Sequence, residues 1–447
     1  MKTTIDAGRN EARCSLDSVG VFNLITDERF FETIEAHLPD HRERIYTPTQ
    51  TLAMFVAQAL CDDRSCQRAV DEHIARCAAH GMRVPSSSTA AYCAARQRLP
   101  LQLVNILCDE VARVAMQTGN DASVESTSTL LVDGTGISMP DTTENQEFFP
   151  QSSNQLEGCG FPQGRFVAMV CARTGVVVHS HVSAAKGKGT GETTALRSMI
   201  EGLAPGTLIV GDAIYEDYFT WALLERAGCS AIFELHGSRL LQNASRQQLT
   251  LERPRRPSWM TKQEYETIPR QIELRIVVST HPTCSDKYLV TSLVEENRHT
   301  DAQILAEFAK RWDIEVDFRS LKDTLAAGIL ACRTPEMVLK ELAVHVLGYN
   351  LVRLLMCEAA DEAGLEPRQI SFRHAQQCWN AWVKSGAPLH EEGWHLLLQR
   401  IGQKKVRNRK GRKEPRAVKR RPKRTTWLDL PRDLAREVCH AYERTGR

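Results

Sequence analysis

The feature that most constrains the fold is a switch from helical to strand periodicity near residue 129. Residues 129–139, "TLLVDGTGISM", read as a strand that ends in a turn, and residues 166–182, "FVAMVCARTGVVVHSHV", as a hairpin closed at Thr174 and Gly175. Helical and strand patterns then alternate up to residue 236, with buried strands predicted at "TLIVGD" and "SAIFELH". Hairpin strands followed by alternating helices and strands predict a mixed α/β sheet.

Helical sequence precedes this sheet. Four segments between residues 25 and 100 carry apolar residues at three- and four-residue spacing, and we expect Thr47, and Ser87 or Ser88, to cap two of the helices. The last segment ends in Arg96 and Arg98, which suits either a helix-turn-helix-like DNA contact or the polar surface of a bundle.

Composition bounds the class of protein. The chain of 447 residues is longer than one ordinary domain, its start has no apolar signal core, and no uncharged run is long enough for a membrane span. The 14 cysteines form neither a CxxC pair nor a disulfide framework, so we read them as reduced and mostly buried. These features predict a cytoplasmic protein without a membrane partner.

One block of the chain is strongly basic. Residues 404–424, "KKVRNRKGRKEPRAVKRRPKR", hold thirteen Lys or Arg against one Glu, a charge of +12 in a chain of net charge +2, so the remainder carries −10. Such a block stays extended unless it meets a polyanion, and nucleic acid is the expected partner through phosphate contacts. The alternative is a solubilising tail.

A glycine-rich segment imitates a phosphate-binding loop. Residues 185–194, "AKGKGTGETT", lie between a predicted strand and a predicted helix, but they lack the GK[ST] order that places a lysine and a hydroxyl on a nucleotide. We therefore expect no nucleotide cofactor.

Two aspartates end predicted strands. Asp133 ends "LLVD" and Asp212 ends "LIVGD", and acids at the carboxyl edge of neighbouring strands face one crevice. Singly, each could be a turn former or a helix N-cap. With a third carboxylate they would supply the oxygen ligands that two hard divalent cations need. Two such ions can activate an attacking oxygen and stabilise the leaving oxygen of a phosphodiester.

The third carboxylate lies in residues 308–322, "FAKRWDIEVDFRSLK". At about 100° per residue, Glu315 lies roughly 40° and Lys322 roughly 20° around a helix from Arg311, with Phe308 roughly 60° away. A carboxylate between two cations suits a divalent metal beside a phosphate. A solvated face with paired charges is the alternative.

Together these motifs resemble the DDE transposases of bacterial insertion sequences, in the subgroup with a Y-x₂-R-x₃-E-x₆-K signature. Phe308, Arg311, Glu315 and Lys322 stand at its four places, and the resemblance extends over "DGTGISMPDTTENQEFFPQ", "GFPQGR", "RPSWM", "LGYNLVRLLM" and "PRAVKRRPK". Two positions depart from the family. Phe308 lacks the hydroxyl of the signature tyrosine, and Ala213 stands where relatives often carry an arginine.

The resemblance implies a multidomain α+β protein with an RNase H-like mixed α/β catalytic core. The expected divisions are a helical N-terminal DNA-binding domain (1–120), the first part of the core (125–237), a β-rich insertion (238–300), the final core helix (301–332), a C-terminal helical region (333–400) and a basic tail (401–447).

The resemblance also implies roles for single residues. Asp133, Asp212 and Glu315 would be the catalytic and metal-binding triad, with two Mg²⁺ or Mn²⁺ ions. The DNA-binding residues would be Phe308, Arg311, Arg319, Lys322, Trp259, Lys419, Arg420 and Arg421. Trp259 would stack on a displaced base, or else pack inside the insertion.

The implied activity is cut-and-paste transposition. A homodimer would bind double-stranded DNA at the terminal inverted repeats, cleave the strands by way of a hairpin or another second-strand route, and join the ends to target DNA on the bacterial nucleoid. A DNA-binding regulator derived from such an enzyme is one alternative, disfavoured by the intact Asp133, Asp212 and Glu315. A plain RNase H-like nuclease is another, and it would need no basic block.

Overall fold

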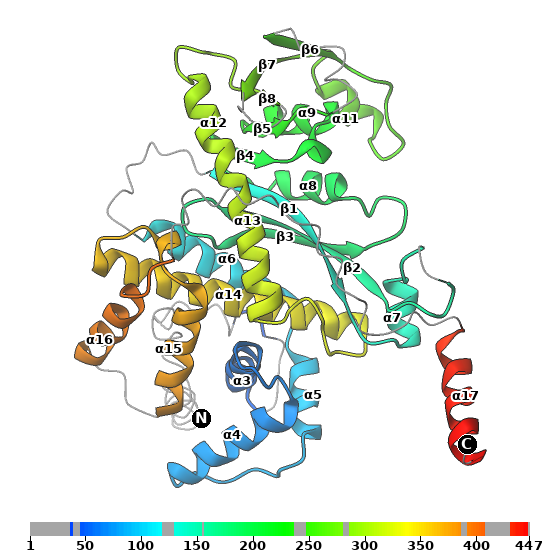
Figure 1. Ribbon diagram of the computed structural model, residues 1–447, viewed down its shortest axis with the longest axis vertical. Helices are drawn as coiled ribbons and strands as arrows, with labels where there is room; N and C mark the ends of the chain where they lie inside the picture. The colour runs from blue at the N-terminus through cyan, green and yellow to red at the C-terminus, as the bar shows by residue number, and fades with distance from the viewer. Residues whose placement is uncertain are drawn as a thin grey trace.

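A computed structural model of the chain describes residues 36–38, 45–118, 129–153, 156–236, 247–279, 286–385, 391–406 and 430–445. Within them, eight strands form one mixed sheet in the order β3-β2-β1-β4-β5-β8-β7-β6 (Figure 1). The strands are β1 (Thr129–Ser138), β2 (Gln163–Cys171), β3 (Val177–Ala184), β4 (Leu208–Gly211), β5 (Ser230–Glu234), β6 (Gln248–Glu252), β7 (Gln271–Ser279) and β8 (Lys287–Thr291). β1, β4 and β5 are parallel, and the other neighbours are antiparallel.

The first strand is longer than the sequence predicts. β1 continues through Asp133 to Ser138 instead of turning, because its second half stays paired with β2 from Asp133 opposite Ala168 to Ser138 opposite Gln163. The expected turn at Asp133 is therefore wrong. Asp133 lies in the middle of an extended strand.

The predicted hairpin is confirmed. β2 and β3 are joined through Gly175, whose φ of +78° suits glycine. Space requires it as well, because a Cβ at Gly175 would lie 2.8 Å from Cζ of Arg353.

The region predicted as an insertion extends the main sheet. β8 pairs antiparallel with β5, Glu234 opposite Leu289, and β7 and β6 follow outward. These strands occupy the far end of the sheet from β3 in Figure 1. The β character is confirmed, and the pairing with β5 joins these strands to the others in one sheet.

Helices make up most of the remaining described chain. They are α3 (Pro48–Leu60), α4 (Cys66–Ala79), α5 (Ala90–Arg98), α6 (Leu101–Gln117), α7 (Thr143–Phe148), α8 (Glu192–Ile200), α9 (Tyr218–Arg226), α11 (Lys262–Thr267), α12 (Asp301–Ala309), α13 (Asp313–Arg319), α14 (Pro335–Ala363), α15 (Phe372–Ser385), α16 (Glu391–Gly402) and α17 (Arg432–Thr445). The short turns η2 (Ala213–Tyr215), η3 (Lys310–Trp312) and η5 (Pro367–Gln369) are 3₁₀, and η4 (Ser320–Thr324) is a π turn.

Capping explains where the N-terminal helices begin. The Thr47 side chain accepts the N–H of Gln50 ahead of Pro48, as predicted for α3. The predicted cap at Ser88 agrees with the structure: Thr89 at the start of α5 makes no side-chain cap bond, and the Ser88 hydroxyl accepts the N–H of Ala90, the first residue of the helix. The earliest predicted helix, residues 25–39, lies almost entirely outside the described residues.

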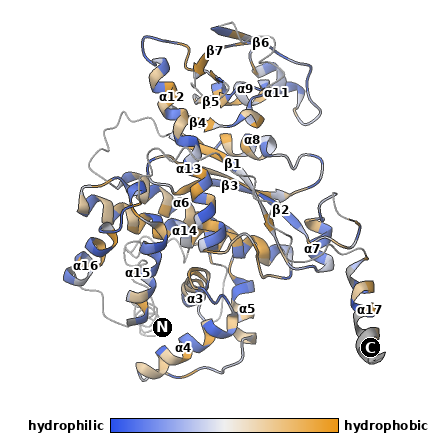
Figure 2. Cartoon of the chain, viewed as in Figure 1, coloured by the Kyte–Doolittle hydropathy of each residue, from blue (hydrophilic) through white to orange (hydrophobic). Residues whose placement is uncertain are grey.

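A single long helix organises the core. α14 packs against α3, α6, α15 and α16, and one hydrophobic cluster runs from α3 and α6 through the sheet to α14. Figure 2 shows hydrophobic residues gathered along the sheet and α14. Among the described helices, α14 alone is long and apolar enough to cross a membrane, but 94% of its apolar window is buried inside the molecule.

Candidate active site

The two aspartates are neighbours across the sheet. β1 and β4 pair in parallel up to Leu131 with Val210, and the same register continued by two residues sets Asp133 opposite Asp212. Asp212 keeps an extended backbone, with φ −88° and ψ −176°, although β4 has ended. Because residues two apart on a strand point to the same face, both carboxylates leave the same face of the sheet, two residues beyond the last paired position.

The electrostatics of Asp133 reflect this crowding. Burial is the main cause that raises the pKa of its carboxyl from 3.8 to about 6, and the negative charges of Asp212 and Glu192 raise it further. The N–H of Gly134, 2.7 Å from Oδ1, and the positive charge of Arg311 lower the pKa. Carboxylates that repel each other at a partly buried site favour a bound cation.

Asp212 also begins a tight turn. Its Oδ1 accepts the N–H of Ile214 at 3.0 Å and so caps η2. The turn ends at Tyr215, which is fully buried and donates its hydroxyl to Oε2 of Glu192 at 3.3 Å. Ala213, at the place where relatives often carry an arginine, lies inside this turn.

The helical segment with the signature is irregular. α12 leads into η3, α13 and the π turn η4, so one 100° projection does not hold from Phe308 to Lys322. Phe308 and Arg311 are only 6% and 8% exposed, whereas Glu315 is exposed. The predicted stripe therefore divides into a buried part and an exposed part.

Two aromatic rings lie close to the side chain of Arg311, which is part of η3. Its guanidinium is 4.4 Å from the centre of the Trp312 ring and 5.8 Å from that of Phe308. Its Nε is buried and has no hydrogen-bond partner among the described residues. A cation held in this way beside Asp133 retains donor capacity for an anionic group.

Lys322 connects the segment to β1. Its Nζ donates to Oγ1 of Thr135 at 2.9 Å. Thr135 lies two residues after Asp133 and so faces the same side of the sheet. The structure thus brings Asp133, Asp212, Arg311 and Lys322 to one face.

Glu315 stands apart from this group. No three His, Cys, Asp or Glu side chains of the described residues lie close enough together to hold a common metal ion. Asp133 and Asp212 fit a hard divalent cation by type and placement. Glu315 is exposed on α13, and this helix contacts β1.

A buried ion-pair network fixes α13. Asp317, 2% exposed, pairs with Arg353 of α14 and, at 3.0 Å, with Arg368 of η5. Arg368 also donates to the carbonyl oxygens of Cys171 and Ala172 at the end of β2. The short helix that carries Glu315 is therefore tied to both α14 and the sheet.

Trp259 and Arg319, two further residues predicted to bind DNA, are both exposed. Trp259 is 52% exposed and rests on Arg197 of α8, 4.7 Å from the ring, and on Phe219 of α9, so the expectation of a ring packed inside the insertion is wrong. Arg319 is exposed at the end of α13. Lys419, Arg420 and Arg421 lie outside the described residues.

The arginines that end α5 do not form a DNA-reading pair. Arg96 is buried, donates to the sulfurs of Cys66 and Cys332, and lies 3.8 Å from the Phe55 ring centre. Arg98 alone of the two is exposed. The helix-turn-helix-like contact is therefore wrong for Arg96, because the cation is used to join α4, α5 and the residues before α14.

Sequence reasoning missed three residues of the site: Thr135, Glu192 and Asp317. Thr135 could have been found from the strand period, since it is two residues after Asp133. The roles of Glu192 and Asp317 depend on contacts with distant segments, for which the sequence carries no local signal.

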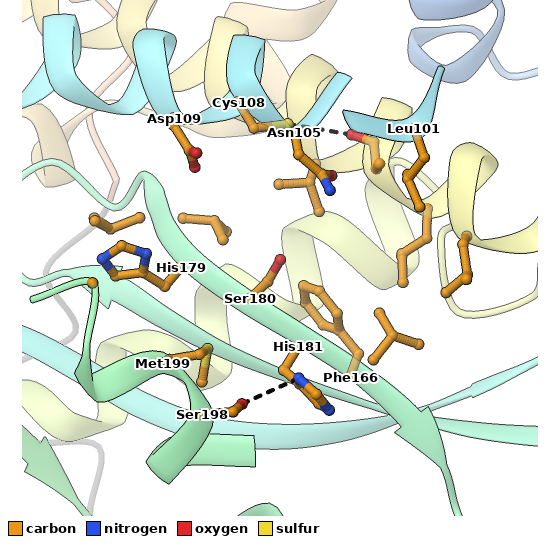
Figure 3. A pocket seen from close by; sticks show the side chains of 18 residues that line it. Leu101, Asn105, Cys108, Asp109, Phe166, His179, Ser180, His181, Ser198 and Met199 are labelled. Carbon is orange, nitrogen blue, oxygen red and sulfur yellow. Dashed lines mark hydrogen bonds between the residues drawn. The ribbon is translucent and has the colours of Figure 1, made fainter. Parts of the chain in front are cut away.

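A separate groove of about 430 Å³ lies between α6, β3 and α8. Figure 3 shows Asn105 and Asp109 on its α6 side, and His181 hydrogen-bonded to Ser198 on the other. Its lining includes none of the predicted catalytic or DNA-binding residues.

Three comparisons show which known proteins the chain resembles. Residues 125–351, just over half of the chain, match the family described as Transposase DDE domain. The chain is 26% identical over 359 residues to the transposase InsG for insertion sequence element IS4 of Escherichia coli (strain K12), covering 76% of this chain and 78% of that one. A cryo-EM structure of the piggyBac transposase synaptic complex with hairpin DNA is 12% identical, with a TM-score of 0.42 over 87% of this chain and 85% of that one.

Proposed function

The chain belongs to the transposases with a DDE domain, and on this premise we propose that Asp133, Asp212 and Glu315 are its catalytic, metal-binding triad. As a member of the family it is a transposase of an insertion element, an enzyme that cleaves and transfers DNA strands with divalent metal ions. The observation that carries the proposal is the register that sets Asp133 opposite Asp212.

The sheet supports an RNase H-like core. β3, β2 and β1 are antiparallel, β4 and β5 run parallel to β1, and the aspartates stand at the carboxyl ends of the parallel pairing. Strands β8, β7 and β6, added beyond β5, support a β-rich insertion between β5 and α12.

The donor set suits two Mg²⁺ or Mn²⁺ ions. Such ions, when bound, would activate the attacking oxygen and stabilise the leaving oxygen of the phosphodiester. Asp133 and Asp212 would hold them at the sheet, and Glu315 would close the site from α13. Arg311 and Lys322 would hold phosphate oxygens on the same face, Arg311 through its unpartnered Nε and Lys322 on release from Thr135.

The DNA would extend beyond this centre. Exposed Arg319 and the half-exposed ring of Trp259 offer a phosphate contact and a stacking surface for a displaced base, and the basic block from Lys404 to Arg424 offers contacts that do not depend on sequence. The substrates would be the terminal inverted repeats and target DNA, and two copies of the chain would hold the two ends in a synaptic complex.

The decisive experiment replaces Glu315, the carboxylate that does not lie with Asp133 and Asp212. Glu315→Gln keeps the volume of the side chain but removes its charge, and a neutral amide is a poorer ligand for Mg²⁺. The variant should fold and bind end-containing DNA, but fail in both strand cleavage and strand joining in a gel assay with Mg²⁺ or Mn²⁺. Asp323→Asn, an exposed acid on the adjoining turn, is the matched control.

Each alternative function predicts a different result in the cleavage and joining assay. A DNA-binding regulator would show no cleavage by the parent chain. A plain nuclease would cut without joining ends. Robust nicking by Glu315→Gln would show that Glu315 is not a catalytic residue.

A further inference from the structure

Gly134 occupies a position where no turn requires a glycine. It lies inside β1, opposite Val167, and its φ is not in the left-handed region. What the glycine provides is space. A Cβ at this position would lie 2.4 Å from Cδ of Glu192, well inside any permitted contact. The backbone directly after Asp133 is therefore the surface against which the Glu192 carboxylate packs.

The same carboxylate contacts two other segments. Glu192 is the first residue of α8, and its Oε2 accepts the hydroxyl of Tyr215, the last residue of the turn that Asp212 begins. Its Oε1 lies 3.4 Å from Nε of Arg165 on β2. One side chain thus joins the strand of Asp133, the turn after Asp212 and a third strand.

This contact lies where backbone pairing stops. The parallel ladder between β1 and β4 ends at Leu131 and Val210, two residues before the aspartates. Beyond that point β1 continues with β2, whereas the chain after β4 turns into η2. No ladder bond between β1 and β4 fixes the distance between the carboxylates there.

We propose that Glu192 is a positioning residue that sets the spacing of Asp133 and Asp212. It acts through its packing on Gly134 and its acceptor oxygen for Tyr215, and it does not itself touch the ion. The inference rests on the proposed metal centre at the two aspartates. Because shape and an acceptor oxygen are what the contact needs, glutamine can replace Glu192 and alanine cannot.

Binding of Mn²⁺ to the full chain, followed by electron paramagnetic resonance of the free ion, tests the proposal without relying on activity. Glu192→Ala should weaken Mn²⁺ binding about 10- to 100-fold, the usual effect of losing a residue that orients a ligand. Glu192→Gln should keep most of the affinity. Glu201→Ala removes an exposed carboxylate at the other end of α8 and should change nothing.

A double-mutant cycle adds a steric test. Gly134→Ala should weaken Mn²⁺ binding as Glu192→Ala does, because the new methyl group displaces the same carboxylate. The double variant should then be no weaker than either single one. Additive losses would show that Gly134 and Glu192 act separately and would overturn the proposal.

Asp133→Asn is a reference variant that distinguishes a failure of the positioning role from a failure of the proposed metal centre. Asp133→Asn should abolish Mn²⁺ binding, and if it binds normally, the centre itself is misplaced. If Asp133→Asn loses Mn²⁺ while Glu192→Ala keeps the parental affinity, only the positioning role fails. Equal losses in Glu192→Gln and Glu192→Ala would indicate that the charge acts, which also overturns it. Melting curves report folding, and Gly134→Ala provides the same test if Glu192→Ala does not fold.

Discussion

At the scale of single residues, Asp133 makes stability depend on pH in the absence of a cation. Its pKa of about 6 in the folded chain exceeds the ordinary 3.8, chiefly because the carboxyl is buried, so the folded state binds the proton more tightly than the unfolded state. The free energy of unfolding contributed by Asp133 should therefore fall as pH rises from about 4 to about 6.

The corresponding experiment compares the parent chain with Asp133→Asn in a chelator. The amide does not titrate. The melting temperature of the variant minus that of the parent should therefore be larger at pH 7.5 than at pH 4.5. Asp323→Asn, which replaces an exposed acid, is the control. An unchanged difference between parent and Asp133→Asn at the two pH values would contradict the assignment.

Lys322 gives a second prediction at this scale. Lys322→Ala should reduce binding to end-containing DNA while lowering the free energy of unfolding by only about 1 kcal/mol, the usual value of one hydrogen bond. Thr135→Val removes the same hydrogen bond but leaves the cation, so DNA binding should persist. Normal binding by Lys322→Ala together with a large loss of stability would make the lysine structural.

At the scale of elements, α13 depends on its buried ion pairs. The helix is seven residues long and is flanked by a 3₁₀ and a π turn, so its own hydrogen bonds fix its direction poorly. Asp317→Ala leaves Arg353 buried without its carboxylate and should lower the free energy of unfolding by about 3 to 5 kcal/mol in urea titration. Asp323→Ala, on the exposed side, should stay within about 0.5 kcal/mol. A small effect of Asp317→Ala would mean that packing alone holds α13.

The elements also show how far the sequence could predict the site. The hairpin at Gly175, the strands before both aspartates and the start of α3 all follow from local patterns, and the structure agrees. The turn expected at Asp133 and Gly134 failed because β1 stays paired with β2 through Ser138, and the glycine instead leaves space beside the strand. Here that space is filled by Glu192, 58 positions further along the chain. The regular helix assumed from Phe308 to Lys322 is interrupted by the 3₁₀ turn η3, which contacts β1, and by the π turn η4, which contacts α14.

At the scale of the whole molecule, the basic block sets the electrostatic contact with DNA. It lies almost wholly outside the described residues, so the prediction rests on charge. Replacing Lys419, Arg420 and Arg421 by glutamine should weaken binding to all DNA sequences and flatten the slope of log K against log salt by up to about 0.9 per lost phosphate contact. Lys262 and Arg298, exposed cations elsewhere, provide a control pair of glutamine substitutions. An unchanged slope in the triple variant would make the block a solubilising tail.

The position of α14 has a consequence for how the chain is made. α3 and α6 pack on this helix, but α14 ends about 250 residues after α6. At roughly 5 to 20 residues per second, a ribosome needs roughly 10 to 50 seconds to supply that stretch. During this interval the faces of α3 and α6 that later pack on α14 lack that partner, and this exposes apolar surface on the nascent chain. We therefore expect slow synthesis and a low supply of chaperones to reduce the yield of folded chain.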